Sequence, residues 1–377
     1  MEEKQSVDFL LLFTALVLAG VGLVMVYSSS MYLSMDKVGD GMFYFKKQSL
    51  RLLAGLFVMM LLTKINYRGY AKLGTFLLIS GFVMLAMLLF QKYVHGRGVD
   101  RWLKVGGFSF QPSEIMKVIV IIYLASALSR MGERVREFKT GFMPLLGVLG
   151  AVFALVVMEP DLGTAGLILV IGFSILFMGR AKLMHLMLVT LPAVAAMVLI
   201  VMTVPYMQKR VELFLDPAGG YQVNQSIIGI GSGGFFGVGL GNSAQKFYFL
   251  PENHTDFVFS IFAEEAGLVG TTILLLLMFV FVYRGFKIAE QAPDMFGFLL
   301  ASGLALMIGI QVFINIGVAT KILPTTGMTL PFISYGGSSL LLSFIATGIL
   351  LNISKQGRYE RRLSREFGSR LQRRSLW

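Results

Sequence analysis

The sequence predicts an all-α integral membrane protein with about ten transmembrane helices. Hydrophobic residues make up 56% of the 377 residues, and they occur in long blocks instead of being mixed with charged residues. Residues 10–26 and 74–90, for example, contain no charged side chain. Such blocks approach the roughly 20 residues with which a helix crosses a hydrocarbon core. Because irregular backbone cannot face lipid, we expect helices here and not the core of a large soluble domain.

In chain order, we expect one polytopic domain over residues 1–377 with its spans placed by these blocks. The expected spans lie near residues 8–28, 44–62, 71–90, 112–130, 141–158, 163–179, 183–203, 257–284, 295–319 and 332–353. The chain contains no cysteine, which excludes disulfides and thiol chemistry. The first block has no small-residue cleavage site before or after it, so we expect an uncleaved first helix and not a signal peptide.

Basic residues indicate which side of the membrane each loop occupies. Lys and Arg gather in alternate loops, for example at Lys64, Arg68 and Lys72, and the tail 354–377 carries seven arginines. The positive-inside rule then places both termini in the cytoplasm. The formal charge of +12 sits largely beside the membrane, so we expect contact with anionic lipid and no nucleic-acid partner.

Two outside segments follow from this topology, residues 91–111 and the long loop 204–256. The long loop holds six glycines between positions 231 and 241 and ends in a polar cluster before the eighth span. The glycines do not form a dinucleotide fingerprint, because no strand and no βαβ unit surrounds them. They favour close helix packing or a re-entrant turn.

Charged residues near the outer ends of spans are functional candidates, because charge is costly in lipid. Glu114 and Lys117 are three residues apart and share one helical face, after a helix start at Gln111 and Pro112. They either form an ion pair that orients the bundle or line a polar cavity where Lys117 meets an anion. Arg101, next to Trp102, either reaches phosphate headgroups or holds a ligand pyrophosphate.

Three further acids have both a structural and a functional interpretation. Asp161 precedes a helix and could cap it or line the same cavity. Asp256 lies at the mouth of the eighth span, where it could be an N-cap or a general base. Glu265, beside Glu264 and two turns further into that span, requires a cavity, a cation or hydrogen bonds.

Two more features are ambiguous in the same way. His254 is expected to support the site and not to bind metal, because the chain has only two other histidines. The run from Ser334 to Ser339 resembles a broken helix start whose free amides could meet an anion. Small residues in that run could equally permit tight helix packing.

Five blocks, in order along nearly the whole chain, resemble the signature blocks of the SEDS family (shape, elongation, division and sporulation). They are Phe110-Gln111-Pro112-Ser113-Glu114 with Lys117, Glu159-Pro160-Asp161-Leu162-Gly163-Thr164, Leu250-Pro251-Glu252 through His254-Thr255-Asp256-Phe257, Glu264-Glu265-Ala266-Gly267, and Leu330-Pro331-Phe332 through Ser334-Tyr335-Gly336-Gly337-Ser338-Ser339. The chain looks closer to the division subfamily, FtsW, than to the elongation subfamily, RodA. Residues 26–30, 245–246 and 324–327 carry that distinction, and Ala266 departs from the larger apolar residue expected there.

This resemblance implies a peptidoglycan glycosyltransferase that polymerises lipid II outside the bacterial cytoplasmic (inner) membrane, at the division septum. The implied partners are a class B penicillin-binding protein, which is the septal transpeptidase, and other divisome membrane proteins. Asp256 matches the family's catalytic aspartate, and Arg101 and Lys117 are the candidates to face the pyrophosphate. A divalent cation such as Mg²⁺ or Mn²⁺ is a further possibility, with no ligands assigned. The remaining expected substrate-binding or cavity residues are Trp102, Gln111, Glu114, Asp161, Glu252, His254, Glu265, Lys321, Ser334 and Ser338.

Two other functions fit a polytopic chain with buried charges. A lipid II flippase or other transporter requires charges through the bilayer midplane, with access from both sides. A non-catalytic scaffold for division proteins predicts that Asp256 and Lys117 are dispensable. Most candidate residues cluster at the outer edge, which favours chemistry at the membrane surface.

Overall fold

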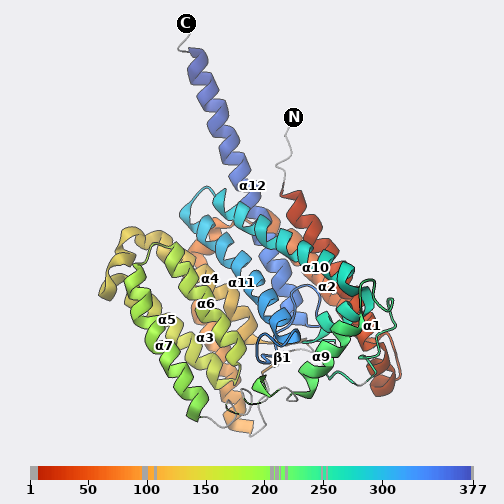
Figure 1. The fold of residues 1–377 in the computed structure, drawn as a ribbon. Coiled ribbons are helices and arrows are strands. Elements are labelled where there is room, and N and C mark those ends of the chain that lie inside the picture. The colour runs from red at the N-terminus through yellow and green to blue at the C-terminus, as the bar shows by residue number, and fades with distance from the viewer. Residues whose placement is uncertain are drawn as a thin grey trace.

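The helical fold predicted from the sequence is confirmed (Figure 1). The computed structural model describes residues 7–95, 101–105, 108–203, 208, 212, 214–216, 220–247, 249–251 and 254–374. Ten helices of 16 residues or more lie in this part of the chain. They are α1 (Phe9–Val38), α2 (Phe43–Lys64), α3 (Arg68–His95), α4 (Pro112–Met131), α5 (Met143–Met158), α6 (Leu162–Met178), α7 (Leu183–Thr203), α10 (Val258–Glu290), α11 (Met295–Ala319) and α12 (Gly337–Arg374).

Each predicted span coincides with one of these ten helices. By length and composition, α1, α3, α4, α5, α10, α11 and α12 can cross a membrane, whereas α6 and part of α7 are shorter apolar helices. The first turns of α2 carry Lys46, Lys47 and Arg51, which lower its hydropathy. The number of spans therefore remains a prediction.

The last helix differs from its predicted bounds at both ends. Residues 331–334 form a turn, so α12 starts at Gly337 and not near residue 332. The helix then continues to Arg374, far past the predicted end of the span at residue 353, and projects away from the bundle (Figure 1). Hydropathy marks where a helix leaves lipid, but polar helix formers can continue the helix in water.

The connections contain structure that the sequence did not reveal. A two-stranded antiparallel hairpin, β1 (Leu103–Val105) with β2 (Phe108–Phe110), precedes α4, and strands of three residues are too short to give a period-two signal. A 3-10 turn (Gly132–Arg136) and a π-helical turn (Phe138–Phe142) join α4 to α5. The long outer loop contains the short helix α9 (Tyr221–Ser232).

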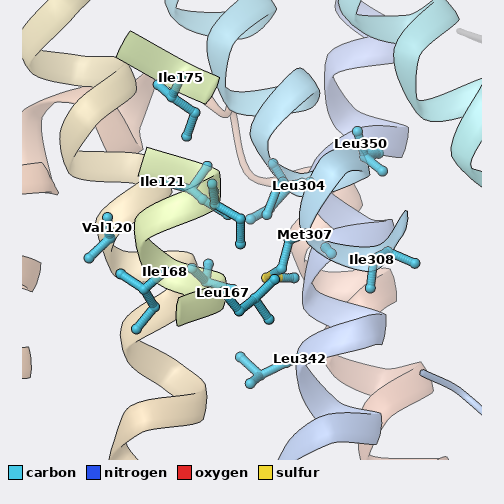
Figure 2. Close-up of a cluster of buried hydrophobic side chains, with 14 of the residues drawn as sticks. Val120, Ile121, Leu167, Ile168, Ile175, Leu304, Met307, Ile308, Leu342 and Leu350 are labelled. Atoms are coloured by element: carbon cyan, nitrogen blue, oxygen red, sulfur yellow. The ribbon is translucent and has the colours of Figure 1, made fainter. Parts of the chain in front are cut away.

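The centre of the bundle is an apolar cluster between α4, α6, α11 and α12 (Figure 2). Ile121, Leu167, Leu304 and Leu342 lie in it, each almost fully buried. Helix association in lipid depends on close packing more than on removing apolar surface from water. Because α4 is enclosed by neighbouring helices, the polar side chains at its outer end face protein and not lipid.

The start of α1 and the end of α12 lie at the same end of the bundle (Figure 1). Asp8 caps α1 by accepting a 3.0 Å hydrogen bond from the amide of Leu11. The same carboxylate accepts hydrogen bonds from Arg284 of α10 and, at 3.1 Å, from Arg358 of α12. This agrees with the prediction that both termini share one side of the membrane, which the basic residues predict to be the cytoplasm.

Candidate functional site

Asp256 lies directly before α10, at the end of the bundle opposite the termini. The helix begins at Val258 with Phe257 as its N-cap residue, so Asp256 does not occupy the N-cap position. Its side chain is partly exposed and faces Gly327, where an added Cβ would lie 3.6 Å from Oδ2. Asn315 Nδ2 of α11 donates to the Asp256 carbonyl at 2.9 Å and to the Met328 carbonyl at 2.7 Å. These contacts join Asp256 to the loop after α11.

The two residues before Asp256 are fixed in the same way. Ser334 Oγ donates to the Thr255 carbonyl at 2.5 Å, and the amide of Tyr335 donates to the His254 carbonyl at 2.9 Å. Three successive backbone carbonyls are thus held by the segment 328–335 and by α11. The His254 ring is buried, with its centroid 5.2 Å from the ring of Tyr44. Such anchoring gives a carboxylate a rigid mount, which acid–base catalysis requires.

Lys117 lies inside the bundle, only 2% exposed. Its Nζ contacts Glu114 Oε1 at 2.8 Å and Gln311 Oε1 at 3.0 Å, which confirms that Glu114 and Lys117 share a helical face. Glu114 Oε2 is buried and has no hydrogen-bond partner among the described residues. Gln311 Nε2 in turn donates to the Thr329 carbonyl at 3.0 Å. The ion pair is therefore tied to the loop that also holds Asp256.

Sequence reasoning missed Gln311 and Asn315, which connect these two groups. They are four residues apart and lie on one face of α11, so both reach the carbonyls at 328 and 329. Both are buried amides within an apolar span. Polar side chains inside a span are unusual, and that signal could have identified them.

A second polar cluster surrounds Asp161 at the start of α6. Its Oδ1 accepts from the amide of Thr164 at 3.2 Å, which confirms the N-cap interpretation. Its Oδ2 accepts from Gln111 Nε2 at 2.8 Å and from Ser113 Oγ at 3.3 Å. The amide of Gln111 donates to Ser338 Oγ at 3.1 Å. Four segments thus meet at this cluster: the end of β2 and the starts of α4, α6 and α12.

Arg101 and Glu159 border this cluster. Arg101 Nη2 donates to the Pro160 carbonyl at 2.6 Å, and the neighbouring Trp102 is exposed. Glu159 was not predicted as a site residue, yet it is only 3% exposed and neither carboxylate oxygen has a hydrogen-bond partner in the described part of the chain. Burial raises the pKa of Glu159 to about 8, the charge of Asp161 adds to this, and Arg101 opposes it.

Two other predicted residues lie in separate surroundings. Glu265 is buried and accepts from Ser28 Oγ of α1 at 2.6 Å, with Lys246 Nζ at 3.4 Å. Lys321 donates to the Asp216 carbonyl at 3.1 Å and lines a cavity of about 270 Å³ with Tyr221. Glu252 lies outside the described residues. The substrate-binding roles of all these residues stay predictions.

The possible divalent cation stays a prediction, because Mg²⁺ can bind through one or two carboxylates together with substrate phosphates. Among the described residues, no group of three His, Asp or Glu side chains comes together in a way that could hold a metal ion. Divalent cations are bound by several oxygen ligands, so we assign no chemical step to a cation held by this chain.

Comparison with known proteins identifies the family. Residues 8–359 match the FtsW/RodA/SpoVE family model, described as cell cycle protein. The chain belongs to this family. Stage V sporulation protein E of Bacillus subtilis is 40% identical over 95% of this chain and 99% of the relative. A probable peptidoglycan glycosyltransferase FtsW of Geobacter sp. is 37% identical over the same shares. The sequence-based assignment to the SEDS family is therefore confirmed.

The fold matches a solved structure as well. A chain from a peptidoglycan synthase complex, whose structure addresses the coordination of polymerization and crosslinking, superimposes with a TM-score of 0.75. It is 28% identical, and the match covers 93% of this chain and 98% of that chain. The match extends over nearly all of both chains, so the arrangement of helices around the candidate site belongs to the family fold.

Proposed function

We propose that this chain is a peptidoglycan glycosyltransferase that polymerises lipid II at the outer face of the bacterial inner membrane. The observation that carries this proposal is the mount of Asp256, a partly exposed carboxylate whose segment is held through three successive carbonyls. A general base needs access to its substrate and a fixed position, and Asp256 has both. The names of the relatives support the same activity.

In this mechanism, Asp256 takes the proton from the attacking hydroxyl of the acceptor sugar. The hydroxyl oxygen forms a bond to the anomeric carbon of the donor, and the bond from that carbon to the pyrophosphate breaks. The leaving undecaprenyl pyrophosphate keeps the electron pair and is stabilised by positive charge. Arg101, half-buried at the edge of the Asp161 cluster, is the candidate for that charge that solvent can reach. Lys117 already forms an ion pair with Glu114, so it would act on the pyrophosphate only at a distance, through its positive charge inside the bundle.

We further propose that the protein works at the division septum with a class B penicillin-binding protein and other divisome membrane proteins. The similarity to a chain of a peptidoglycan synthase complex supports a partner of this kind. Polymerisation at the outer face and crosslinking by the partner would then occur on the same side of the membrane.

The test is glycan polymerisation by the purified chain together with its cognate class B partner, whose transpeptidase serine is mutated so that only polymer is scored. Asp256→Asn keeps the shape of the side chain and the backbone bond to Asn315, but removes the base. We expect its rate to fall by about 10² to 10⁴-fold. Asp40→Asn, an acid near the same face that pairs with Lys46 at 2.8 Å, should polymerise normally.

Normal polymerisation by folded Asp256→Asn would contradict the role of this residue while keeping the enzyme. If the wild-type complex makes no polymer but moves lipid II across liposome membranes, the activity is transport and the proposal is wrong.

A further inference from the structure

The glycine segment, residues 233–241 of the long outer loop, docks into a break in α10. Backbone hydrogen bonds join the glycine segment to α10 on both sides of Gly267. They are Val238 N to Glu264 O (3.0 Å), Gly239 N to Glu265 O (3.1 Å), Leu268 N to Gly234 O (2.9 Å) and Val269 N to Phe235 O (3.1 Å). The segment thus satisfies the helix groups that the break would leave without partners. This docking fixes the depth of the segment along α10.

Glycine is required at the two centres of this contact. Gly267 has φ 66° and Gly237 has φ 79°, a region that other residues rarely adopt. A Cβ at Gly267 would lie 2.2 Å from the amide nitrogen of Gly237, and a Cβ at Gly237 would lie 2.1 Å from the Glu265 carbonyl oxygen. The close approach of the two backbones is therefore built into the sequence.

The docking places the tip of the glycine segment, Phe235 and Phe236, beside the lipid-facing side of α10. The uncharged stretch 266–283 of α10 spans about 27 Å at 1.5 Å per residue, close to the thickness of a hydrocarbon core. Leu268 and Val269 lie at the outer end of that stretch and are exposed. Their hydrogen-bond partners bring Phe235 and Phe236 to the same level.

The segment presents large apolar side chains outward at this level. Phe236 is 84% exposed and Phe235 is 70% exposed, and Leu240 is exposed beside them. The preceding helix α9 continues this surface, because it buries Val223, Ser226 and Gly229 and exposes Ile227 and Ile228. Residues 221–241 contain no charged side chain. A surface of this kind is typical of an interaction site and not of a water-facing loop.

We propose that α9 and the glycine segment form a lipid-inserted hairpin whose tip, Phe235 and Phe236, enters the outer leaflet of the membrane. Continuity with the lipid-facing side of α10 favours acyl chains over a protein partner as the occupant. Phe and Leu are among the side chains with which interfacial segments bury an apolar face at the boundary between headgroups and acyl chains.

The hairpin leads directly into the candidate site. Glu264 accepts hydrogen bonds from Ser243 Oγ and, at 3.0 Å, from the amide of Ala244, which follow the glycine segment. The chain then continues to Asp256. Insertion of the tip therefore holds the outer loop at the level of the lipid headgroups. On the proposed function, this is where the lipid-linked substrate presents its pyrophosphate.

The chain has no cysteine, so single-cysteine variants can be spin-labelled without background. We would label Phe236→Cys in the full chain, reconstituted in phosphatidylethanolamine–phosphatidylglycerol vesicles, and compare its accessibility to oxygen and to a water-soluble nickel chelate. Ile273→Cys, on the lipid-facing side of α10, is the membrane control. Asp36→Cys, exposed near the outer end of α1, is the water control. Phe235→Cys repeats the measurement one residue away.

Insertion predicts that the labels at 235 and 236 resemble the label at 273, with oxygen accessibility exceeding nickel accessibility by several-fold. Nickel accessibility equal to that at 36 would overturn the proposal and leave a water-facing loop. Low accessibility to both reagents, seen only when a partner protein is present, would overturn it in favour of a protein contact. None of these outcomes depends on polymerisation, so the hairpin and the proposed activity are tested separately.

Discussion

At the scale of single residues, the Glu114–Lys117 pair has a structural role that the contacts show and a catalytic role that is proposed. Both side chains are almost fully enclosed, and Lys117 Nζ donates to both Glu114 Oε1 and Gln311 Oε1. Removing one partner of a buried pair leaves an uncompensated charge, whereas replacing both often costs little. The two roles can therefore be separated by mutation.

Lys117→Met should destabilise the protein by about 3 to 5 kcal/mol, because Glu114 is left buried and unpaired. The double variant Glu114→Gln/Lys117→Met should recover most of this stability, as measured by thermal unfolding in detergent. If the positive charge contributes to catalysis, the double variant remains inactive in polymerisation. Recovery of activity together with stability would show that the pair only orients the bundle.

Glu159 predicts a pH dependence of stability. Burial raises its pKa to about 8 from an ordinary value of 4.5, so the folded state holds a proton that the unfolded state releases. The contribution of Glu159 to the free energy of unfolding is fully present below pH 4.5 and is lost as the pH rises towards 8. The loss is at most about 1.4 kcal/mol per pH unit. Glu159→Gln should unfold at a higher temperature than wild type at pH 8 and nearly the same temperature at pH 5. An unchanged pH profile would contradict a protonated Glu159.

At the scale of elements, α11 links the buried ion pair to the candidate base. Asn315→Ala removes two hydrogen bonds, one of which holds the carbonyl of Asp256. Each lost bond to a buried group costs about 1 to 3 kcal/mol, so we expect the polymerisation rate of the folded variant to fall at least tenfold. The apparent affinity for lipid II should change little, because Asn315 itself contacts only backbone.

Asn352→Ala is the matched control for this prediction. Asn352 of α12 is equally buried, and it also makes two bonds to backbone, with Tyr67 N and Thr63 O, near the opposite end of the bundle. It should lower the unfolding temperature to a similar extent without reducing the polymerisation rate of the folded protein. Equal loss of rate in both variants would mean that Asn315 acts only through global stability.

At the scale of the whole molecule, the two ends of the chain are joined by Asp8. Although burial alone raises its pKa, hydrogen bonds from Arg284 and Leu11, together with the charges of Arg284 and Arg358, hold the pKa of Asp8 below its usual range. A depressed carboxyl pKa stabilises the fold above the unfolded pKa and loses this effect as the pH falls through the folded value.

Asp8→Ala should therefore lower the unfolding temperature by several degrees at neutral pH, and the difference from wild type should shrink in acid. Polymerisation by the folded variant should be unaffected, because Asp8 lies at the opposite end from Asp256. Asp40→Ala, whose carboxylate pairs with Lys46 in an exposed position, is the control and should change stability little. A similar effect of both substitutions would show that the contact between the termini contributes no more than an exposed pair.

The sequence by itself determined the helices, because lipid forces every backbone group in a long apolar block into an internal hydrogen bond. It also placed Glu114 with Lys117 on one helical face and predicted the start of α4, since these depend on spacing along one helix, and it offered a cap at Asp161 as one of two interpretations. Asp256 stood out through its position at a helix mouth and through the family motif.

Only the tertiary structure decided which distant residues meet. The pairing of Glu265 with Ser28, the clamp of Asn315 on Asp256 and the docking of the glycine segment into the break at Gly267 join segments that are far apart in the sequence. Periodicity reports the face of one helix, whereas these contacts depend on how helices pack against one another. The same packing raises the pKa of Glu159 and exposes Phe236, because burial is a property of the neighbours and not of the residue.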